Sequence, residues 1–416
     1  MRILWICQTV PPEADALIGG DKELKKTGGW ILGMAAELIK IKDLELAIAS
    51  VSPLVDGLKV LQGEHVKYFV APSVKSVKDK KLEQNWKVVN SEYKPDVVHI
   101  HGTEYNHALS WVYANGAENV VVSLQGIMSA YYYYYYYGIS QWDVLKNITP
   151  RDLYRETVFG GARRFARIAK SEQELLRKVN HVIGRTDWDK NQLWAINPEA
   201  HYHFNNEVLR KEFYDGSVWN YKSCNKFTIF VNQAEAPYKG IHQLIKALPL
   251  IIREFPQVRI RVAGFNPCDT SFRRRLMRTG YGRFLNKLMK KYAVTEYIEF
   301  IGPQNAEAMK QELLKANVFV LPSSIENSSN ALGEAQMLGA PCVASRVGGM
   351  ATMIPDPKCG SLYRFSDIAE LAYSICEALR ESEHFDNSEM RKVASERHNG
   401  ATNSKALVEI YNSIIL

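Results

Sequence analysis

The sequence lacks any long apolar run. No stretch of its 416 residues approaches the roughly 18 consecutive apolar residues that a membrane-spanning helix needs. The first residues, MRILWICQTVPPE, carry one positive charge and a short apolar run that two prolines interrupt, which is unlike a secretory signal peptide. We therefore expect a cytoplasmic protein whose membrane contact is limited to a peripheral one at the inner face of the membrane.

Cysteine pairs are also absent. The six cysteines are scattered along the chain, and none stands in a CxxC spacing. Such paired spacings are typical of zinc sites and of redox motifs, so the sequence predicts neither. Several of the cysteines lie in apolar segments. We therefore expect reduced, buried thiols.

A strong excess of one charge is missing as well. The formal net charge is only +7, although basic residues gather at 161–170 and at 271–292. A basic cluster suits a solvated helix face, an anionic membrane surface or a nucleic acid. The solvated face is the commonest explanation of such a run. We expect no nucleic-acid partner, and peripheral contact with an anionic membrane stays open as an alternative.

What is present is the composition of a globular α/β protein. Hydrophobic residues make up 46% of the chain and charged residues 23%, which is typical of soluble globular proteins. A chain of 416 residues exceeds the size at which one core keeps growing, so two domains of about 200 residues each are expected. Strand-like apolar runs alternate with helix-like segments in both halves, and this alternation predicts mostly parallel sheets.

The alternation is interrupted once, by a polar and aromatic stretch near 214–225. We therefore predict a doubly wound, Rossmann-like N-terminal domain over 1–215, a linker over 216–225, and a second Rossmann-like domain over 226–395. The remaining segment, 396–416, is predicted to be a C-terminal helix that packs back on the N-terminal domain. Because doubly wound sheets bind ligands at the carboxyl ends of their strands, a cleft between the two domains is the expected ligand site.

The segment at 318–345 carries the most informative pattern in the chain. An apolar strand there leads into a loop, and a helix then begins near Asn330 and ends at Gly339. The backbone N–H groups of Asn330, Ala331 and Leu332 would then lie at the carboxyl end of the strand. Unpaired donors and the helix macrodipole both favour an anion at that place.

Two carboxylates flank this predicted anion site. Glu334 lies about one turn into the helix, and Glu326 lies in the loop before it. Acids beside an anion site are explained if the ligand carries hydroxyl groups as well as phosphates, and a nucleotide sugar carries both. Lys239 follows the predicted strand KFTIFVN, where its cation can neutralise the charge on a departing diphosphate.

Glycines, tyrosines and acids mark three further features. Gly28 and Gly29 would let a backbone loop approach a diphosphate closely. Residues 131–137 are seven consecutive tyrosines, which suit packing, stacking on an acceptor sugar, or contact with a lipid headgroup layer. Asp187 and Asp189 form a DxD pair that we expect to cap a helix rather than hold a metal ion. No metal site is predicted.

Six blocks of sequence resemble a known family. They are GGW at 28–30, KPDVVHIHG, YKGIHQLIKAL, RIRVAG, IEFIG and PSSIENSSNALGEAQMLGAPCVASRVGG. Any one block is a weak signal, whereas all six in this order are specific. Over essentially its full length the chain resembles the retaining GT-B glycosyltransferases of family four. The resemblance implies the GT-B fold, in which two Rossmann-like domains face each other across a cleft, and sugar transfer with retention, without a metal ion or other cofactor.

The resemblance also implies roles for individual residues. In that family the second glutamate holds the ribose hydroxyls and the first approaches the donor sugar, which assigns Glu334 and Glu326. Lys239 and Gly240 would bind the diphosphate together with the amides at the start of the following helix. The implied donor is a UDP- or GDP-linked nucleotide sugar. The implied acceptor is a glycan or a lipid-linked glycan. Catalysis is expected to depend on Glu326 and Lys239.

Two positions depart from the family pattern. Relatives commonly carry an arginine six residues before the lysine, where this chain has Gln233. We expect Arg185 either to supply the second cation or to pair with a neighbouring acid. Relatives often have a histidine near the acceptor where this chain has Gln125. A glutamine can hydrogen-bond a sugar hydroxyl but cannot transfer a proton, so we expect Gln125 to contact the acceptor without acting as a base. We also expect His101, which ends its predicted strand, to contact the acceptor.

The sequence therefore predicts a hexosyltransferase-type glycosyltransferase that acts in cell-surface polysaccharide or glycan assembly. Two alternatives remain open. A GT-B sugar-nucleotide epimerase would share the two domains and would need no acceptor. A non-catalytic nucleotide-sugar-binding protein would share the donor site, and Gln233 is its only support at the level of residues.

Overall fold

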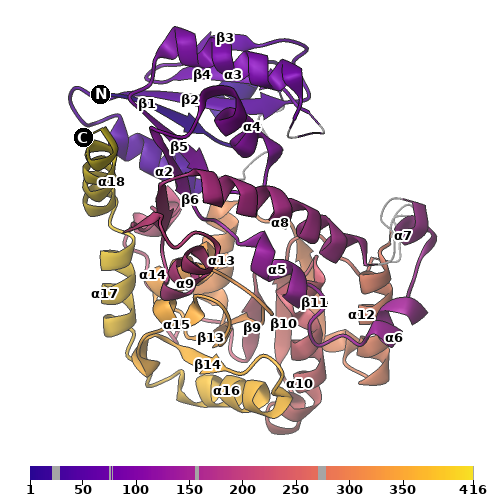
Figure 1. Ribbon diagram of the computed structural model, residues 1–416. Coiled ribbons are helices and arrows are strands. Elements are labelled where there is room, and N and C mark those ends of the chain that lie inside the picture. The colour runs from indigo at the N-terminus through magenta and orange to yellow at the C-terminus, as the bar shows by residue number, and fades with distance from the viewer. Residues whose placement is uncertain (21–28, 75, 77, 155–158, 270–277, 416) are drawn as a thin grey trace. The chain divides into compact units, whose positions relative to one another are not determined.

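Figure 1 shows the computed structural model of the chain, which describes residues 1–20, 29–74, 76, 78–154, 159–269 and 278–415. The chain divides into two compact units. The first unit comprises 1–130, 166–210 and 398–416, and the second unit comprises 131–165 and 211–397. Each unit is built on its own sheet.

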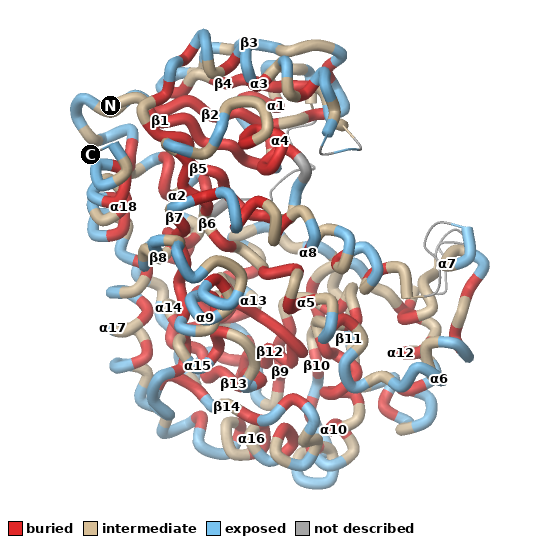
Figure 2. Tube along the Cα trace, in the orientation of Figure 1, coloured by how far each residue is buried: buried red, intermediate tan, exposed pale blue. Residues whose placement is uncertain are grey.

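The first sheet has eight strands in the order β3-β4-β2-β1-β5-β6-β7-β8. All neighbours are parallel except β3 and β4, which are antiparallel. The strands are β1 (Arg2–Ile6), β2 (Glu45–Ser52), β3 (Lys59–Gln62), β4 (Lys67–Pro72), β5 (Val97–His101), β6 (Val120–Ser123), β7 (His181–Gly184) and β8 (His201–Phe204). Figure 2 shows the central strands buried, as expected for parallel strands covered on both faces.

Helices complete the first unit. They are α1 (Pro12–Leu17), α2 (Gly29–Leu38), α3 (Lys80–Tyr93), α4 (Asn106–Asn115), most of α8 (Gly160–Lys178), α9 (Asp187–Ile196) and α18 (Gly400–Ile415). The last helix packs against α2. Its buried Tyr411 hydroxyl accepts a hydrogen bond from Trp5 Nε1 at 2.9 Å and bonds His99 Nδ1 at 2.7 Å. These two bonds tie the C-terminal helix to β1 and β5.

The second sheet has six strands in the order β11-β10-β9-β12-β13-β14, and all its neighbours are parallel. They are β9 (Thr228–Val231), β10 (Arg259–Ala263), β11 (Ile298–Gly302), β12 (Val318–Leu321), β13 (Cys342–Ser345) and β14 (Ser361–Tyr363). Its helices are α5 (Met128–Tyr134), α6 (Gln141–Lys146), α7 (Pro150–Tyr154), α10 (Ile241–Glu254), α12 (Gly280–Lys291), α13 (Ala306–Lys315), α14 (Asn330–Leu338), α15 (Met350–Met353), α16 (Ile368–Glu381) and α17 (Ser388–Arg397). The sheets therefore confirm the doubly wound α/β class predicted from the alternation of apolar segments.

Three strands were not predicted from the sequence. They are β3, β8 and β14, and each lies at an edge of its sheet. Edge strands have one solvated side, so they need no continuous apolar run: β8 reads HYHF, and none of its residues is buried. No helix among the described residues has the length and apolarity needed to cross a bilayer.

Candidate active site

The order of strands in the second sheet reverses between β9 and β12. From β9 the chain continues to β10 and β11 on one side, and it then crosses to β12, β13 and β14 on the other side. Open α/β sheets bind ligands at such a switch point, outside the carboxyl ends of the strands. Lys239 follows β9 and Glu326 follows β12, so the topology brings both residues to this edge.

Lys239 and Glu326 form a buried ion pair there. Lys239 Nζ lies 2.7 Å from Glu326 Oε1, and the two side chains are only 16% and 12% exposed. Ser323 Oγ donates a second hydrogen bond to the same carboxylate oxygen at 2.8 Å. Burial by itself lowers the pKa of Lys239, but the Glu326 carboxylate and Tyr238 outweigh burial, so the pKa is raised. The lysine therefore carries its positive charge at neutral pH.

Two glycines allow the backbone to bring this pair together. Gly240 has φ +73°, and a Cβ added there would lie 1.7 Å from the carbonyl oxygen of Pro322. Gly348 has φ +50°, and its added Cβ would lie 1.9 Å from the carbonyl oxygen of Glu326. Because only glycine is free of both the strain and the clash, Gly240 lets the loops after β9 and β12 lie against each other, and Gly348 lets the loop after β13 approach the loop after β12.

Helix α14 begins at the same edge of the sheet. Its N-cap is Ser329, whose hydroxyl accepts the N–H of Leu332 at 3.4 Å, and its C-cap is Gly339 in the left-handed region. These observations confirm the start and the end that the sequence predicted. The positive end of the helix macrodipole therefore lies beside the carboxyl end of β12, where it favours an anion.

Glu334 is buried on α14, with only 3% of its surface exposed. Glu334 is therefore not a solvated residue of the helix surface. A buried carboxylate costs free energy unless hydrogen bonds compensate it, and it accepts strong bonds from hydroxyl donors. The position is compatible with the ribose contact expected from the sequence.

Part of the tyrosine run packs beneath the Lys239 loop. The ring of Tyr135 lies 5.6 Å from that of Tyr238 and 5.0 Å from that of Phe165. Lys239 Nζ in turn lies 5.1 Å from the ring centre of Tyr238. Ser324 Oγ donates to the carbonyl oxygen of Tyr134 at 2.7 Å. Tyr135 is therefore a packing residue that supports the loop holding the lysine.

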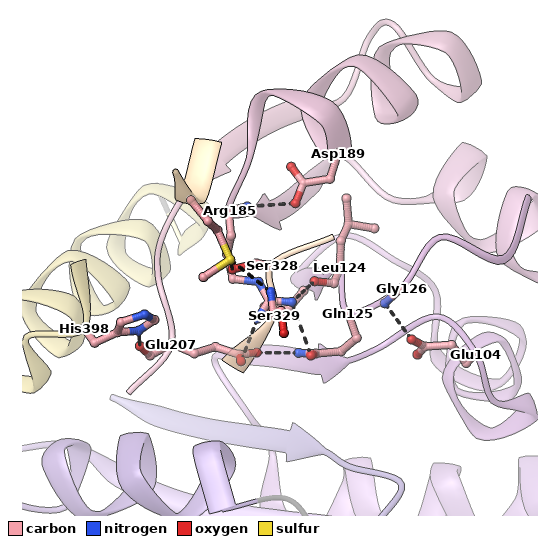
Figure 3. Close-up of polar contacts among 12 residues, drawn as sticks. Glu104, Leu124, Gln125, Gly126, Arg185, Asp189, Glu207, Ser328, Ser329 and His398 are labelled. Carbon is pink, nitrogen blue, oxygen red and sulfur yellow. Dashed lines mark hydrogen bonds and ion pairs between the residues drawn. The ribbon is translucent and has the colours of Figure 1, made fainter. Parts of the chain in front are cut away.

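A second polar cluster lies in the first unit (Figure 3). Arg185 forms an ion pair with Glu207 at 2.6 Å and is almost fully buried. It also donates to the carbonyl oxygen of Leu124 at 2.9 Å and to the side chain of Gln125 at 3.3 Å. Gln125 Nε2 donates to Glu207 at 2.7 Å. Of the two roles expected for Arg185, the structure shows the pairing with an acid.

The same cluster borders a pocket of about 360 Å³ that His101 also lines. His101 is buried, and burial lowers its pKa to about 3, so the ring is neutral at physiological pH. His99 bonds Tyr411 and Ser123 Oγ, at 2.7 and 2.6 Å, and is a core residue as predicted. Gln125, Arg185 and His101 are thus brought together in one unit.

Burial also raises the pKa of one acid next to this cluster. Glu104 accepts the backbone N–H of Gly126 at 2.8 Å (Figure 3), yet burial raises the pKa of its carboxyl group to about 7. The DxD acids behave as predicted, because Asp189 forms a capping box with Thr186 at the start of α9. Among the described residues, no group of His, Cys, Asp or Glu has the arrangement of a metal site.

Some expected residues are not placed by these contacts. Gly28 lies outside the described residues, and Gly29 is the first residue of α2. Gln233 lies two residues beyond the end of β9, at the carboxyl edge of the sheet. Ser323, which donates to Glu326, and Gly348, which lies against its carbonyl oxygen, were not predicted from the sequence. The signal for both was present, because serines directly follow the strand and a Gly-Gly pair follows the next strand.

Comparison with known proteins gives a family match over the second unit. The model of the family described as glycosyl transferases group 1 matches residues 218–397. The D-inositol 3-phosphate glycosyltransferase of Corynebacterium urealyticum is 27% identical over 178 residues, which are 42% of this chain and 40% of that protein. The phosphatidylinositol N-acetylglucosaminyltransferase gpi3 subunit of Schizosaccharomyces pombe is 25% identical over 181 residues, 42% of this chain and 36% of that protein. The matched part thus spans about two fifths of these relatives.

Solved structures match over the whole chain. Sucrose-phosphate synthase of Thermosynechococcus elongatus has a TM-score of 0.69 at 15% identity and covers 99% of this chain and 98% of its own. HepE of Anabaena, in complex with UDP and glucose, has a TM-score of 0.64 at 17% identity and covers 99% of this chain and 100% of its own. Likeness at such identities shows the fold alone. The fold is GT-B, as predicted from the resemblance.

Proposed function

We propose that this chain, which carries a group 1 glycosyltransferase domain at 218–397, is a retaining and metal-independent glycosyltransferase that moves a sugar from a nucleotide-sugar donor to an acceptor hydroxyl. The observation that carries the proposal is the buried Lys239–Glu326 pair beside the first turn of α14. A cation, a carboxylate and a helix N-terminus at a strand-order switch point together suit a ligand that combines phosphates with hydroxyls.

The diphosphate and the ribose of the donor bind to different groups of the site. The diphosphate lies at the start of α14, where backbone N–H groups and the macrodipole favour negative charge. The ribose lies against Glu334, because a carboxylate accepts two hydrogen bonds from a vicinal diol. The complexes of HepE with UDP and with UDP-glucose support a uridine nucleotide as the first donor to test.

Lys239 supplies the charge that the leaving group needs. When the bond between sugar and phosphate breaks, negative charge develops on the departing diphosphate, and a fixed cation stabilises it in the transition state. The raised pKa of Lys239 keeps this cation present. A lysine can meet this need without a metal ion, which supports metal-independent transfer.

Glu326 contacts the donor sugar in this proposal. Its carboxylate accepts bonds from Lys239 and Ser323 through Oε1, and a carboxylate has the capacity for further donors such as sugar hydroxyls. Transfer with retention then proceeds by departure of the diphosphate on the same face that the acceptor hydroxyl enters. The leaving phosphate takes the acceptor proton, so catalysis consists of positioning and charge stabilisation.

The acceptor is proposed to be a glycan or lipid-linked glycan of cell-surface assembly. Two relatives support a lipid or inositol acceptor, since they are named for inositol 3-phosphate and for phosphatidylinositol. His101 and Gln125 are proposed as acceptor contacts. Burial lowers the pKa of His101 and so makes it a weak base, and a glutamine amide does not take up a proton, so we propose that both side chains orient a hydroxyl.

The test begins with donor identity. A thermal-shift panel of UDP- and GDP-sugars selects the donor, because a ligand that binds only the folded state raises the melting temperature. Release of UDP or GDP is then measured for the wild type, K239A and E326Q. Both variants are expected to lose turnover by at least roughly a hundredfold, as is typical when a charge-stabilising group is removed.

The matched control is K310A. Lys310 is also a buried lysine of the second unit, and it pairs with Asp215 at 2.7 Å on another element. K310A should keep the turnover of the wild type, although it too loses the stability that comes from a paired lysine, as K239A does. Wild-type turnover in K239A and E326Q would refute the proposed function. Conversion of the donor to a new sugar nucleotide without any acceptor would instead identify an epimerase.

A further inference from the structure

Large apolar side chains gather on one short surface segment of the second unit. Residues 141–154, which form α6 and α7, expose Trp142, Leu145, Leu153 and Tyr154 by 66%, 40%, 68% and 87%. Apolar side chains scattered singly over a surface are normal, whereas a cluster of them marks an interaction site. Four such side chains in one segment of this length therefore need an explanation.

Folding of the segment does not supply that explanation, because other residues anchor it. Val144 and Ile148 face inward and line, with Phe284 of α12, a pocket of about 660 Å³. Asp152 accepts the backbone N–H of Gly280, at the start of α12, at 2.9 Å. Helix α6 also packs against α12. The four exposed side chains are not part of these contacts.

The neighbouring helix adds positive charge. Lys287, Lys290 and Lys291 are exposed on α12, whose sequence GYGRFLNKLMKK contains no acid. The apolar face of α12 is buried in the second unit, so its lysines point away from the core. Lys291 and Asp143 of α6 both act electrostatically on Lys246, which places the end of α12 beside α6.

We propose that α6, α7 and the three exposed lysines of α12 form a docking surface for a bilayer that contains anionic phospholipid. The inference deepens the proposed function and rests on it in one respect: it says where an enzyme with a lipid-linked acceptor meets the membrane. Figure 1 shows these three helices grouped together. The three lysines belong to the basic run at 271–292, whereas α6 and α7 lie outside both basic runs and outside the tyrosine run.

The chemistry of the surface matches each layer of such a bilayer. Trp142 and Tyr154 have an apolar ring with a polar atom, which suits the headgroup level. Leu145 and Leu153 gain by leaving water for the boundary of the acyl chains. Lysines near an anionic surface each contribute an attraction of about a factor of five, which salt screens. A purely polyanionic partner would leave the leucines without a role.

The test measures co-sedimentation of the full chain with vesicles of phosphatidylcholine alone and of phosphatidylcholine with phosphatidylglycerol. The wild type is expected to bind the anionic vesicles at low salt and to lose binding at high salt. The variant W142S/L153S/Y154S should bind at least roughly tenfold more weakly, because the apolar contact is gone. The variant K287Q/K290Q/K291Q should bind roughly a hundredfold more weakly, since it removes three attractions.

Matched controls use side chains of similar exposure elsewhere. W194S/L54S/Y373S removes a tryptophan, a leucine and a tyrosine that are 70%, 53% and 65% exposed, and K78Q/K81Q/K87Q removes three exposed lysines at and before α3. Both controls should bind vesicles like the wild type. Melting temperatures in the absence of vesicles verify that all variants fold.

Three results would overturn the proposal. They are no vesicle binding by the wild type, equal binding to neutral and anionic vesicles, and equal weakening by the control variants. The first would leave a protein partner as the occupant of this surface. Donor binding is followed in parallel by the thermal shift with UDP, which the surface variants should leave unchanged. Loss of the docking proposal with intact UDP binding and turnover would therefore leave the proposed function standing.

Discussion

The Lys239–Glu326 pair allows a quantitative prediction of coupling. The change E326Q removes the negative charge, keeps the shape of the side chain, and leaves the lysine buried without its counter-ion. Breaking a buried ion pair in this way costs about 3–5 kcal/mol of unfolding free energy. The glutamine oxygen can still accept from Ser323 and Lys239, so we expect a loss of about 2–3 kcal/mol, and a similar loss for K239M.

The double variant K239M/E326Q decides whether the two residues act as a pair. It removes both charges, so no uncompensated ion remains, and its loss should fall short of the sum of the single losses by about 2 kcal/mol. The four proteins are compared by urea denaturation. The transitions of the two units are fitted separately, because a chain with two compact units need not unfold in one step.

The pH dependence of the coupling gives a second readout. The pKa of Lys239 is raised in the folded state. A basic group whose pKa is higher in the folded than in the unfolded state contributes its full stabilisation below the unfolded pKa. That stabilisation is lost as the pH rises through the folded pKa. The coupling should therefore be constant across neutral pH and decline only in strong alkali.

Two outcomes would refute this account. Additive losses in the double-variant cycle would show that the lysine and the glutamate do not stabilise each other. Turnover retained in E326Q would separate the pair from catalysis. The comparison pair is Lys310–Asp215, in which the acid is 46% exposed. K310M should cost much less unfolding free energy than K239M, because solvent screens the interaction.

Further predictions concern a glycine, an acid and a histidine. G348A should destabilise the protein by at least about 2 kcal/mol in urea denaturation, because of its positive φ and the clash with Glu326, whereas G57A, which has nothing within 4 Å of its added Cβ, should be neutral. E334Q should weaken UDP more than 2′-deoxy-UDP in the thermal shift, and equal weakening would exclude a ribose contact. Burial, with help from Lys246, lowers the pKa of His242 to about 3. The neutral His242 ring therefore stabilises the fold above the unfolded pKa near 6.5, and this contribution to the free energy of unfolding falls by about 2 kcal/mol when the pH is lowered to 5. H242Q should make the free energy of unfolding depend less on pH between 6.5 and 5. An unchanged dependence would contradict this.

Much of the candidate site followed from local sequence. The start of α14 near Asn330 and its end at Gly339 could be predicted because helix starts and left-handed helix ends are decided by a few neighbouring residues. The central strands were predictable for a similar reason, since their continuous apolar runs need no knowledge of their partners. The edge strands β3, β8 and β14 escaped prediction because only pairing with a neighbour makes them strands.

The sequence by itself determined the α/β class, the order of the motifs, and the residue types from which a nucleotide-sugar site is proposed. Only the tertiary structure decided which of them meet. Lys239 and Glu326 stand 87 residues apart in the chain, and they pair because β9 and β12 are neighbours at the switch point of the sheet. Arg185 was expected to serve the diphosphate or to bind an acid, and the structure shows its bond to Glu207. The physical reason is the same in both cases. Contacts between distant segments depend on the order of the strands in the sheet and on which buried charges can pair with each other, and a local stretch of sequence predicts neither.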